Sequence, residues 1–131
     1  MSLNQMELDK KLFEISELPD FLSVPLISPS MIGVDGSTPL HVAALRGDDE
    51  LVSELLSEGV DYNHRTKEGL TPLHFAIMFG KPTIIEKLLN NGADSSIVSN
   101  DGLSGCDLTH LLDDDVLIKQ IQNMLMTRLA K

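Results

Sequence analysis

The sequence of 131 residues has one cysteine, no tryptophan and one tyrosine. Because Cys106 has no second cysteine to pair with, an internal disulfide is excluded, and nothing in the chain indicates an oxidising compartment. Aromatic platforms on which nucleotide bases could stack are scarce. The chain is nevertheless long enough for one domain with a hydrophobic core that needs neither disulfides nor bound metals. We therefore predict a single domain over residues 1–131.

Basic residues and long apolar runs are also scarce. Ten Lys and Arg stand against twenty Asp and Glu, and the net charge of -10 repels phosphate backbones and anionic membrane surfaces. The longest uncharged run, residues 21–34, has fourteen residues and two prolines, too few and too interrupted to cross a bilayer. The N-terminus lacks the apolar core of a signal peptide. We expect a soluble, cytoplasmic protein, monomeric when free, without nucleic-acid or membrane partners.

The sequence does contain an internal repeat. Residues 35–67 and 68–100 are identical at eleven of thirty-three aligned positions, and the phrase TPLHVAALRG that begins at Thr38 returns as TPLHFAIMFG from Thr71. A period between twenty and fifty residues is typical of a solenoid, in which each unit buries its apolar face against its neighbours. The repeat therefore predicts a stack of similar units.

Local signals within each repeat predict a helix, a turn, a second helix and a returning loop. Thr38 and Thr71 are good N-caps, and Pro39 and Pro72 follow at the first helical position, where a missing N–H costs little. A glycine then ends each first helix. The second helices carry apolar stripes at helical spacing, formed by Leu51, Val52, Leu55 and Leu56 and by Ile84, Ile85, Leu88 and Leu89.

The two units, DGSTPLHVAALRGDDELVSELLSEGVDYN and EGLTPLHFAIMFGKPTIIEKLLNNGADSS, resemble ankyrin repeats in both their thirty-three-residue length and their T-P-L-H-x-A signature. The resemblance implies an all-α solenoid of stacked helix-turn-helix units with short returning loops. We divide the domain into an N-terminal capping repeat at 2–32, repeats at 33–65 and 66–98, and a C-terminal capping repeat at 99–131.

The two capping repeats are expected to be degenerate. In the C-terminal one, Leu117 and Ile121 keep the register of the second helix, but Gln122 takes the place of Leu89. In the N-terminal one, a short helix is expected to carry four apolar residues, and a second helix, disturbed by prolines, is expected to follow. These residues are Met6, Leu8, Leu12 and Phe13 in the first helix, Leu18 and Leu22 in the second, and the prolines Pro19 and Pro25.

His41 and His74 invite a catalytic interpretation, but they occupy equivalent positions in the two repeats, and Asp107 ends the series. Neither histidine is accompanied by a partner nucleophile. The resemblance implies that both are structural and link the threonine turn to the neighbouring loop. We therefore predict structural roles for Thr38, Pro39, His41, Thr71, Pro72 and His74, and no catalytic residue.

A metal site is the main chemical alternative. Cys106 and His110 lie four residues apart, a spacing that places two ligands on one helix face, with His41, His64 and His74 as further candidates. The paired spacing of a structural zinc site is missing, and Cys106 replaces Leu73 in phase, which favours a small buried hydrophobe. We predict no metal and no other cofactor; a metal-dependent enzyme built on these residues stays the alternative.

The acidic runs at Asp48 and Asp113 could suggest calcium or paired-carboxylate chemistry. They fall where second helices begin, and negative side chains are favoured there by the exposed N–H groups. Asn63 lies in a leucine, aspartate and asparagine spacing that resembles the one hydroxylated in ankyrin repeats of animal cells. The competing interpretation is that Asn63 is a loop residue bonding its own backbone.

The resemblance implies that a partner protein binds on the concave face, made by the loop tips and the ends of the first helices. Apolar residues such as Phe79 and Leu70 stand where a solvated repeat would favour polar ones, although Met78 and Leu45 could instead pack between repeats. The predicted partner-binding residues are Val34, Asp35, Ser37, Leu45, Arg46, Lys67, Glu68, Leu70, Met78, Phe79, Asn100, Asp101, Leu103, Leu111 and Leu112.

We therefore predict a non-catalytic protein-binding module. The acidity of the chain favours a partner with a basic patch, which charge complementarity would bring to this surface faster. An alternative within protein binding is an acidic inhibitor or immunity-type protein that masks the basic active site of a partner enzyme.

Overall fold

The computed structural model of the protein describes residues 4–22 and 27–129. Helices and loops make up this part of the chain, without a strand, which confirms the predicted all-α class. The helices are α1 (Gln5–Ser16), α2 (Pro39–Arg46), α3 (Asp49–Ser57), α4 (Pro72–Met78), α5 (Pro82–Asn90), α6 (Gly105–Leu108) and α7 (Asp115–Leu129), with short 3-10 helices η1 (Pro19–Phe21) and η2 (Thr109–Leu111).

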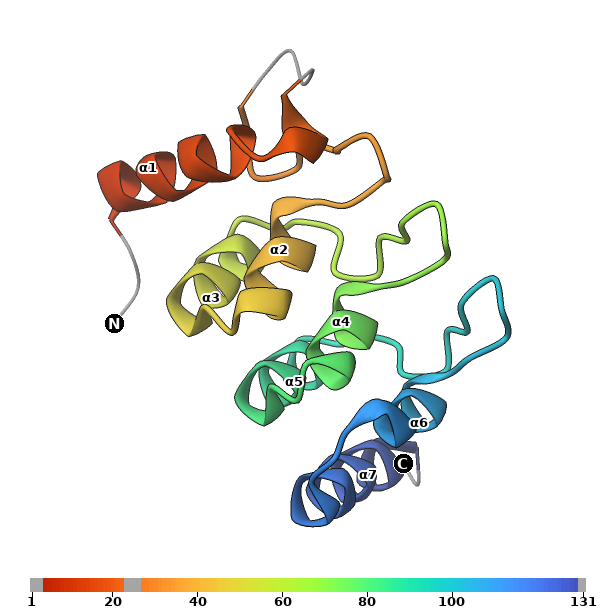
Figure 1. The fold of residues 1–131 in the computed structure, drawn as a ribbon. Helices are drawn as coiled ribbons and strands as arrows, with labels where there is room; N and C mark the ends of the chain where they lie inside the picture. The colour runs from red at the N-terminus through yellow and green to blue at the C-terminus, as the bar shows by residue number, and fades with distance from the viewer. Residues whose placement is uncertain (1–3, 23–26, 130–131) are drawn as a thin grey trace.

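The helices form two layers. The first helices of the units stack in one layer, α2 on α4 and α4 on α6, while α3, α5 and α7 stack in the other. Figure 1 shows the resulting staircase, with the loops that return from each second helix extending to one side of the stack. The concave face is the surface made by the tips of these loops and the adjoining first helices.

The core lies within and between these layers. Ala43 and Ala76 are fully buried, and their small side chains let the backbones of α2 and α4 approach closely. The second helices contribute larger apolar groups, such as the fully buried Val52 and Ile85. Truncating one such buried aliphatic side chain to alanine typically costs about 2–5 kcal/mol. Burial between neighbours therefore stabilises helices that are too short to form alone.

The N-terminal unit departs from the expected pair of helices. One twelve-residue helix, α1, packs against both α2 and α3, and the expected second helix is reduced to the 3-10 turn η1. Pro19 begins this turn, because a proline has no N–H for a continuing helix. Leu22, expected in the second helix, is exposed. Residues 2–3 and 23–26 of the predicted capping repeat, Pro25 among them, lie outside the described residues.

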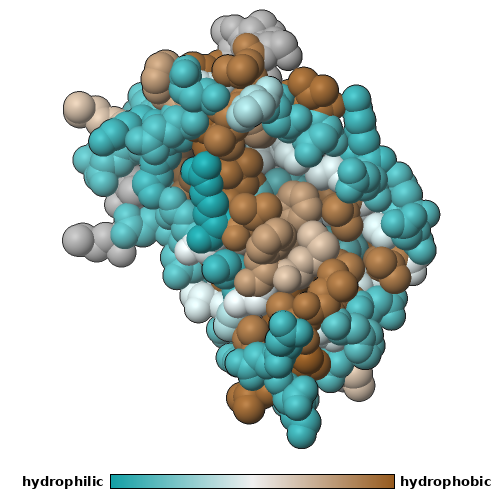
Figure 2. All heavy atoms as spheres, viewed as in Figure 1, coloured by the Kyte–Doolittle hydropathy of each residue, from teal (hydrophilic) through white to brown (hydrophobic). Residues whose placement is uncertain are grey.

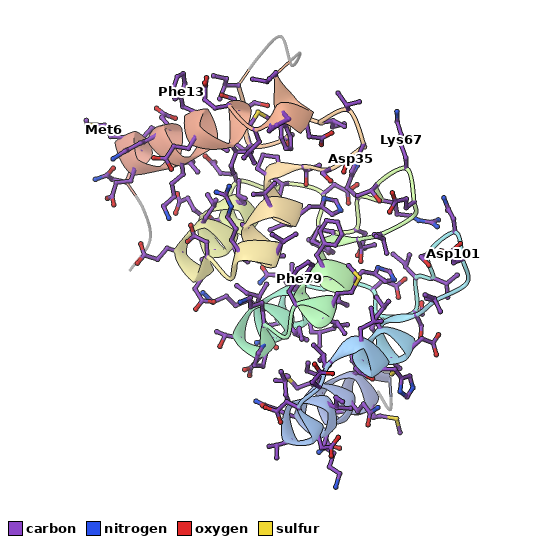
Figure 3. All side chains as sticks on the ribbon, viewed as in Figure 1. Met6, Phe13, Asp35, Lys67, Phe79 and Asp101 are labelled. Atoms are coloured by element: carbon purple, nitrogen blue, oxygen red, sulfur yellow. The ribbon has the colours of Figure 1, made fainter. Side chains whose placement is uncertain are left out.

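The four apolar residues expected in the first helix all lie in α1, but they differ in their exposure to solvent. Leu8 and Leu12 are buried, together with Ile15, whereas Met6 and Phe13 are exposed. Figure 3 shows Met6 and Phe13 projecting from α1 away from the stack. The outer surface of the N-terminal unit is therefore partly apolar.

The C-terminal unit keeps the helix-turn-helix plan in shortened form. Its first helix, α6, is a single turn followed by η2, and its second, α7, buries Ile121 and Leu125. Gln122, at the position of Leu89, donates from its side-chain amide to Oγ1 of Thr109 at 3.2 Å. Within the described part of the chain, no helix combines the length and the apolar character needed to cross a membrane.

Candidate functional site

A histidine joins each clear repeat to the loop that follows it. The backbone N–H of Thr38 donates to Nδ1 of His41 at 3.1 Å, so the ring hydrogen lies on Nε2, which donates to the carbonyl of Leu70 at 2.9 Å. His74 makes the same two bonds one repeat later, with Nε2 3.3 Å from the carbonyl of Leu103. Both nitrogens of each ring are thus occupied, and neither is free to ligate a metal.

The electrostatics of these histidines agree with this bonding. His41 is fully buried, and burial lowers its pKa to about 4. Burial also lowers the pKa of His74. Both rings are therefore neutral at neutral pH. Thr38, Pro39, Thr71 and Pro72, which precede the histidines, are buried too.

The last unit replaces this histidine with a carboxylate. The backbone N–H of Ser104 donates to Oδ2 of Asp107 at 2.9 Å, which retains the local half of the arrangement. Hydrogen bonding to Ser104 holds the pKa of Asp107 below its ordinary value. Asp107 is exposed, so the start of α6 is capped without a link to a further loop.

The loop tips are held in a row by hydrogen bonds between successive repeats. The N–H of Lys67 donates to the carbonyl of Asp35 at 2.8 Å, and the N–H of Asn100 donates to the carbonyl of Glu68 at 2.9 Å. Gly69 has a φ of +84°, and a Cβ there would lie 2.7 Å from the backbone nitrogen of Asn100. The loop tips are therefore bonded to one another and form one continuous edge.

The predicted partner-binding residues differ in their exposure. Eleven are exposed: Val34, Asp35, Leu45, Arg46, Lys67, Glu68, Phe79, Asn100, Asp101, Leu103 and Leu111. Leu70, Met78 and Leu112 are half-buried, and Met78 and Leu112 pack against the core. Ser37 is buried, because it lies in the turn directly before the Thr38 cap. Ser37 is therefore not part of the exposed surface.

The exposed part of this set combines an apolar centre with polar edges. Figure 2 shows hydrophobic side chains gathered in the hollowed middle of this face, with hydrophilic residues on both sides. Phe79 lies at the end of α4, while Asp35, Lys67 and Asp101 lie along the row of loop tips (Figure 3). Half of the Phe79 surface is open to solvent. This combination is typical of a protein-binding surface.

A cavity of about 350 Å³ opens between the N-terminal unit and the first two repeats. Val42 and Phe75 line it from α2 and α4, together with Leu45, Leu18 and Phe21. Val42 and Phe75 are absent from the predicted set, which contains only loop tips and the ends of the first helices. Their signal in the sequence is an apolar residue directly after each histidine.

Two carboxyl groups, those of Asp20 and Asp35, also line this cavity. The backbone N–H of Asp35 donates to Oδ1 of Asp20 at 2.9 Å. Burial, followed by the hydrogen bond between the two carboxyl groups, raises the pKa of Asp20. Burial acts to raise the pKa of Asp35 as well, but hydrogen bonds from Asp20 and Ser37 lower it overall. The sequence does not indicate that Asp20 lines a cavity, because this residue lies in the irregular N-terminal unit.

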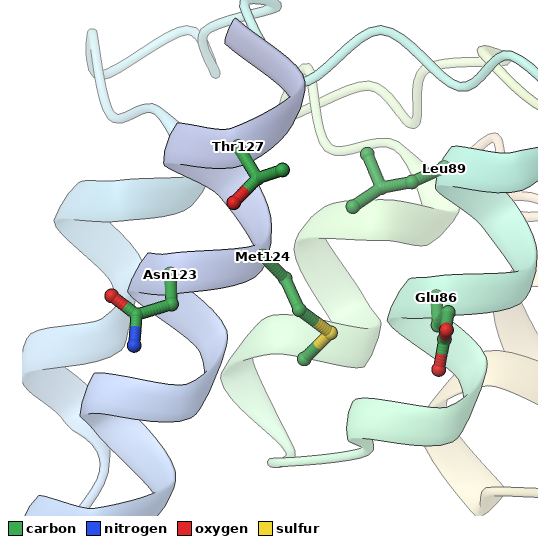
Figure 4. Close-up of a pocket in the computed structure, with 5 residues that line it drawn as sticks. All are labelled: Glu86, Leu89, Asn123, Met124 and Thr127. Carbon is green, nitrogen blue, oxygen red and sulfur yellow. The ribbon is translucent and has the colours of Figure 1, made fainter. Parts of the chain in front are cut away.

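A second hollow, of about 280 Å³, lies between α5 and α7 in the other helix layer. Figure 4 shows its lining by Glu86, Leu89, Asn123, Met124 and Thr127. Glu86 is the titratable group of this set, so the lining offers no acid–base pair for chemistry. We interpret this hollow as a packing gap at the junction with the degenerate last unit.

The candidate metal ligands are not brought together. Cys106 is half-buried and packs against the core, whereas His110 is exposed. Across the described residues, no three His, Cys, Asp or Glu side chains are grouped so that they could hold a metal ion. His41 and His74 are already engaged by the bonds described above. These residues therefore form no assembled metal-binding site in this part of the chain.

The side chain of Asn63 makes a bond between repeats. Its Oδ1 accepts from the backbone N–H of Asp94 at 3.0 Å, whereas the competing interpretation from the sequence placed its bond within its own loop. Asn63 is half-buried. Its side-chain amide therefore links the returning loop of one repeat to that of the next.

Comparison with known protein families identifies the kind of repeat. A family model for ankyrin repeats, in three copies, matches residues 15–99. The match begins within α1 and extends through both clear repeats, so the N-terminal unit is counted in part as a repeat. The comparison with curated proteins finds no match.

Proposed function

We propose, from the premise that this chain belongs to the ankyrin-repeat family, that it binds a partner protein on its concave face. Ankyrin repeats are generally protein–protein interaction modules and typically carry no catalysis. The proposed contact residues are the exposed members of the predicted set, extended by Val42 and Phe75. We propose that the protein itself catalyses no reaction.

The observation that supports this proposal most directly is the apolar centre of the concave face. Leu45, Phe79 and Leu103 are exposed there, although they come from three successive units. Clustered apolar groups with a polar rim favour association, because burying them removes apolar surface from water while the rim supplies hydrogen bonds. Phe79 is the best single candidate for an anchor, since aromatic residues often carry much of the binding energy.

The scaffold beneath this surface is preorganised. The histidine bonds fix each loop to the preceding helix, and the loop-to-loop bonds between Lys67 and Asp35 and between Asn100 and Glu68 fix the tips to one another. A surface that is already ordered loses little conformational entropy when a partner binds. We therefore propose binding to a largely pre-formed face.

The charge of the protein suggests the character of the partner. A net charge of -10 favours a partner with a basic patch, chiefly by speeding encounter. Masking of a basic active site, as by an inhibitor or immunity-type protein, is the narrower alternative. The metal-dependent enzyme built on Cys106 and the histidines is the alternative of a different class. We further propose a cytoplasmic protein that is monomeric when free.

The proposal can be tested with two matched substitutions. Phe79 and Phe13 have similar exposure, 50% and 54%, but Phe13 lies on the outer side of α1. Partners captured from the native lysate by the tagged protein would be identified by mass spectrometry, and their retention compared for Phe79→Ser and Phe13→Ser. We expect Phe79→Ser to weaken retention at least about tenfold, and Phe13→Ser to leave it unchanged.

Circular dichroism and urea unfolding show whether both variants keep the native fold. Equal retention by the two variants would place the binding surface elsewhere. Loss of retention with Phe13→Ser alone would move it to the outer face of α1.

A further inference from the structure

The cavity between the N-terminal unit and the first two repeats forms one end of the concave face. Its volume of about 350 Å³ lies within the range of about 300–1,000 Å³ that small-ligand sites occupy. Its apolar walls are Leu18, Phe21, Val42, Leu45 and Phe75. The cavity is therefore large enough for a whole side chain. Its apolar walls suit the aliphatic or aromatic part of that side chain.

The polar part of the lining contains two carboxylates, those of Asp20 and Asp35, beside Ser37, His41 and Arg46. Asp20 and Asp35 lie within hydrogen-bonding reach of one another, and burial raises the pKa of Asp20. Oδ2 of Asp20 is buried and receives no hydrogen bond from any described residue. Two carboxylates at close range repel each other, and a proton or a cation between them relieves that repulsion.

No cation in the described part of the chain fulfils that role. Among the described residues, neither Asp20 nor Asp35 takes part in an ion pair, whereas Asp48 pairs with Lys11 and Asp49 with Lys87. Arg46 lines the same cavity, but its side chain is exposed. Oδ2 of Asp20 is buried beside Gly33, whereas Asp35 is exposed, so a cation from outside reaches the pair at the Asp35 carboxylate.

We propose that this cavity binds an arginine side chain of the partner protein, with the guanidinium at the Asp20 and Asp35 carboxyl groups and the aliphatic stem along the apolar walls. The inference rests on the proposed function, because the arginine belongs to the protein bound on the concave face. It narrows the basic partner to one that presents an arginine at the end of its contact surface nearest the N-terminal unit.

Arginine fits this lining better than lysine for two reasons. Its planar guanidinium has five N–H donors and can bond two carboxylates at once, whereas an ammonium group is a compact point charge. Guanidinium is also more weakly hydrated and stacks on aromatic faces, so it enters an apolar cavity at lower cost. Phe75, which is half-buried, supplies such a ring.

The experiment uses the full chain, labelled with ¹⁵N, and the probe Nα-acetyl-arginine methylamide. We expect saturable shifts of the backbone amides of Asp35, Ser37 and Val42, with the corresponding lysine probe several-fold weaker. The citrulline probe, which has the same shape without the charge, should produce no saturable shift. If the citrulline probe bound as tightly as the arginine probe, the proposal would be overturned. Equal affinity of the lysine probe would also overturn it.

Asp35→Asn tests the acidic pair, and Asp101→Asn is the matched control, since it removes the same charge at the equivalent loop position two repeats later. We expect Asp35→Asn to weaken the arginine probe at least about tenfold and Asp101→Asn to leave it unchanged. Leu45→Lys, which places a positive charge on an exposed wall residue, is a second variant should Asp35→Asn disturb the loop; we expect it to remove the saturable shifts.

Equal weakening by the two asparagine variants would show that only overall charge matters and would overturn the proposal, as would the absence of any shift with the arginine probe. The result of the probe experiment can be separated from the test of the proposed function. If the arginine probe fails while Phe79→Ser still releases the partner, the concave-face proposal stands and the arginine cavity is wrong. If Phe79→Ser has no effect, the partner surface fails independently of the probe.

Discussion

His41 donates from Nε2 to the backbone carbonyl of Leu70, 2.9 Å away and twenty-nine residues further along the chain. Leu70 directly precedes Thr71, the N-cap of α4, so this bond holds the start of the next repeat against the first helix of the one before. Asp107 occupies the equivalent position in the last unit, where no further described loop offers such a carbonyl. The histidine is therefore absent from the unit in which no following described loop offers a carbonyl to accept its hydrogen bond.

Replacing His41 with alanine should destabilise the protein substantially. His41→Ala leaves the Thr38 N–H without a partner, removes one of the two hydrogen bonds that the Leu70 carbonyl accepts, and opens a cavity in a fully buried site. We expect a loss of about 2–4 kcal/mol in the free energy of unfolding, measured by urea denaturation at pH 7. The exposed His110→Ala is the control and should change stability by less than about 0.5 kcal/mol. Similar losses for both variants would contradict a structural role for His41.

Burial of neutral His41 also predicts a pH dependence. Its pKa falls from an ordinary 6.5 in the unfolded chain to about 4 in the folded protein. Between these values the unfolded state binds the extra proton, so the stability contributed by His41 is complete above pH 6.5 and is lost as the pH falls towards 4. The loss approaches about 3 kcal/mol.

The contribution of His41 can be isolated with His41→Gln, which cannot titrate. Asp20 acts in the opposite direction, because its raised pKa means that the folded state binds the proton, and His74 acts in the same direction as His41. Comparing urea denaturation of the two proteins at pH 7 and pH 5 cancels both effects. We expect the natural protein to lose more stability than His41→Gln; parallel losses would show that His41 titrates normally when folded.

Gly69 and Gly102 form a natural pair for testing the loop-to-loop contact. They occupy equivalent repeat positions and have φ of +84° and +80°, but a Cβ at Gly102 would meet nothing within 4 Å. Gly102→Ala should cost about 1–2 kcal/mol from backbone strain alone. Gly69→Ala should cost at least about 1 kcal/mol more, because its methyl group collides with the backbone of Asn100. Equal unfolding free energies would contradict close packing of these two loops.

Association with a basic partner should depend on salt. Exposed charges are screened over about 10 Å at 0.1 M ionic strength, so raising sodium chloride from 50 to 500 mM shortens the range of attraction. We expect the association rate to fall by about tenfold or more, with a smaller change in the dissociation rate, in surface plasmon resonance with the captured partner. A rate that does not respond to salt would argue against charge-guided encounter.

Metal analysis separates the binding module from the metalloenzyme alternative. We expect purified protein to contain clearly substoichiometric zinc, because the candidate ligands Cys106, His41 and His74 are not brought together. Inductively coupled plasma mass spectrometry would measure this, with Cys106→Ser as the matched variant. Stoichiometric metal that disappears in Cys106→Ser would overturn the non-catalytic assignment.

The sequence alone determined the features that depend on near neighbours. The Thr38 and Thr71 caps, the prolines after them and the glycines that end the helices act within a few residues, so each repeat could be predicted from its own segment. Recurrence after thirty-three residues then indicated stacking, because a unit with one apolar stripe must cover it with a similar neighbour. The family followed from the same residues.

The tertiary structure decided what happens where the repeat becomes irregular. The reduction of the N-terminal unit to α1 and η1, and the contribution of Asp20 to the contact with Asp35, involve a segment before the clear repeats that has no close counterpart one period away. Their positions depend on contacts between the cap and α2, and no local signal encodes such contacts. For the same reason the apolar centre of the concave face could be predicted at Phe79, whereas the acidic cavity at its end became visible only in three dimensions.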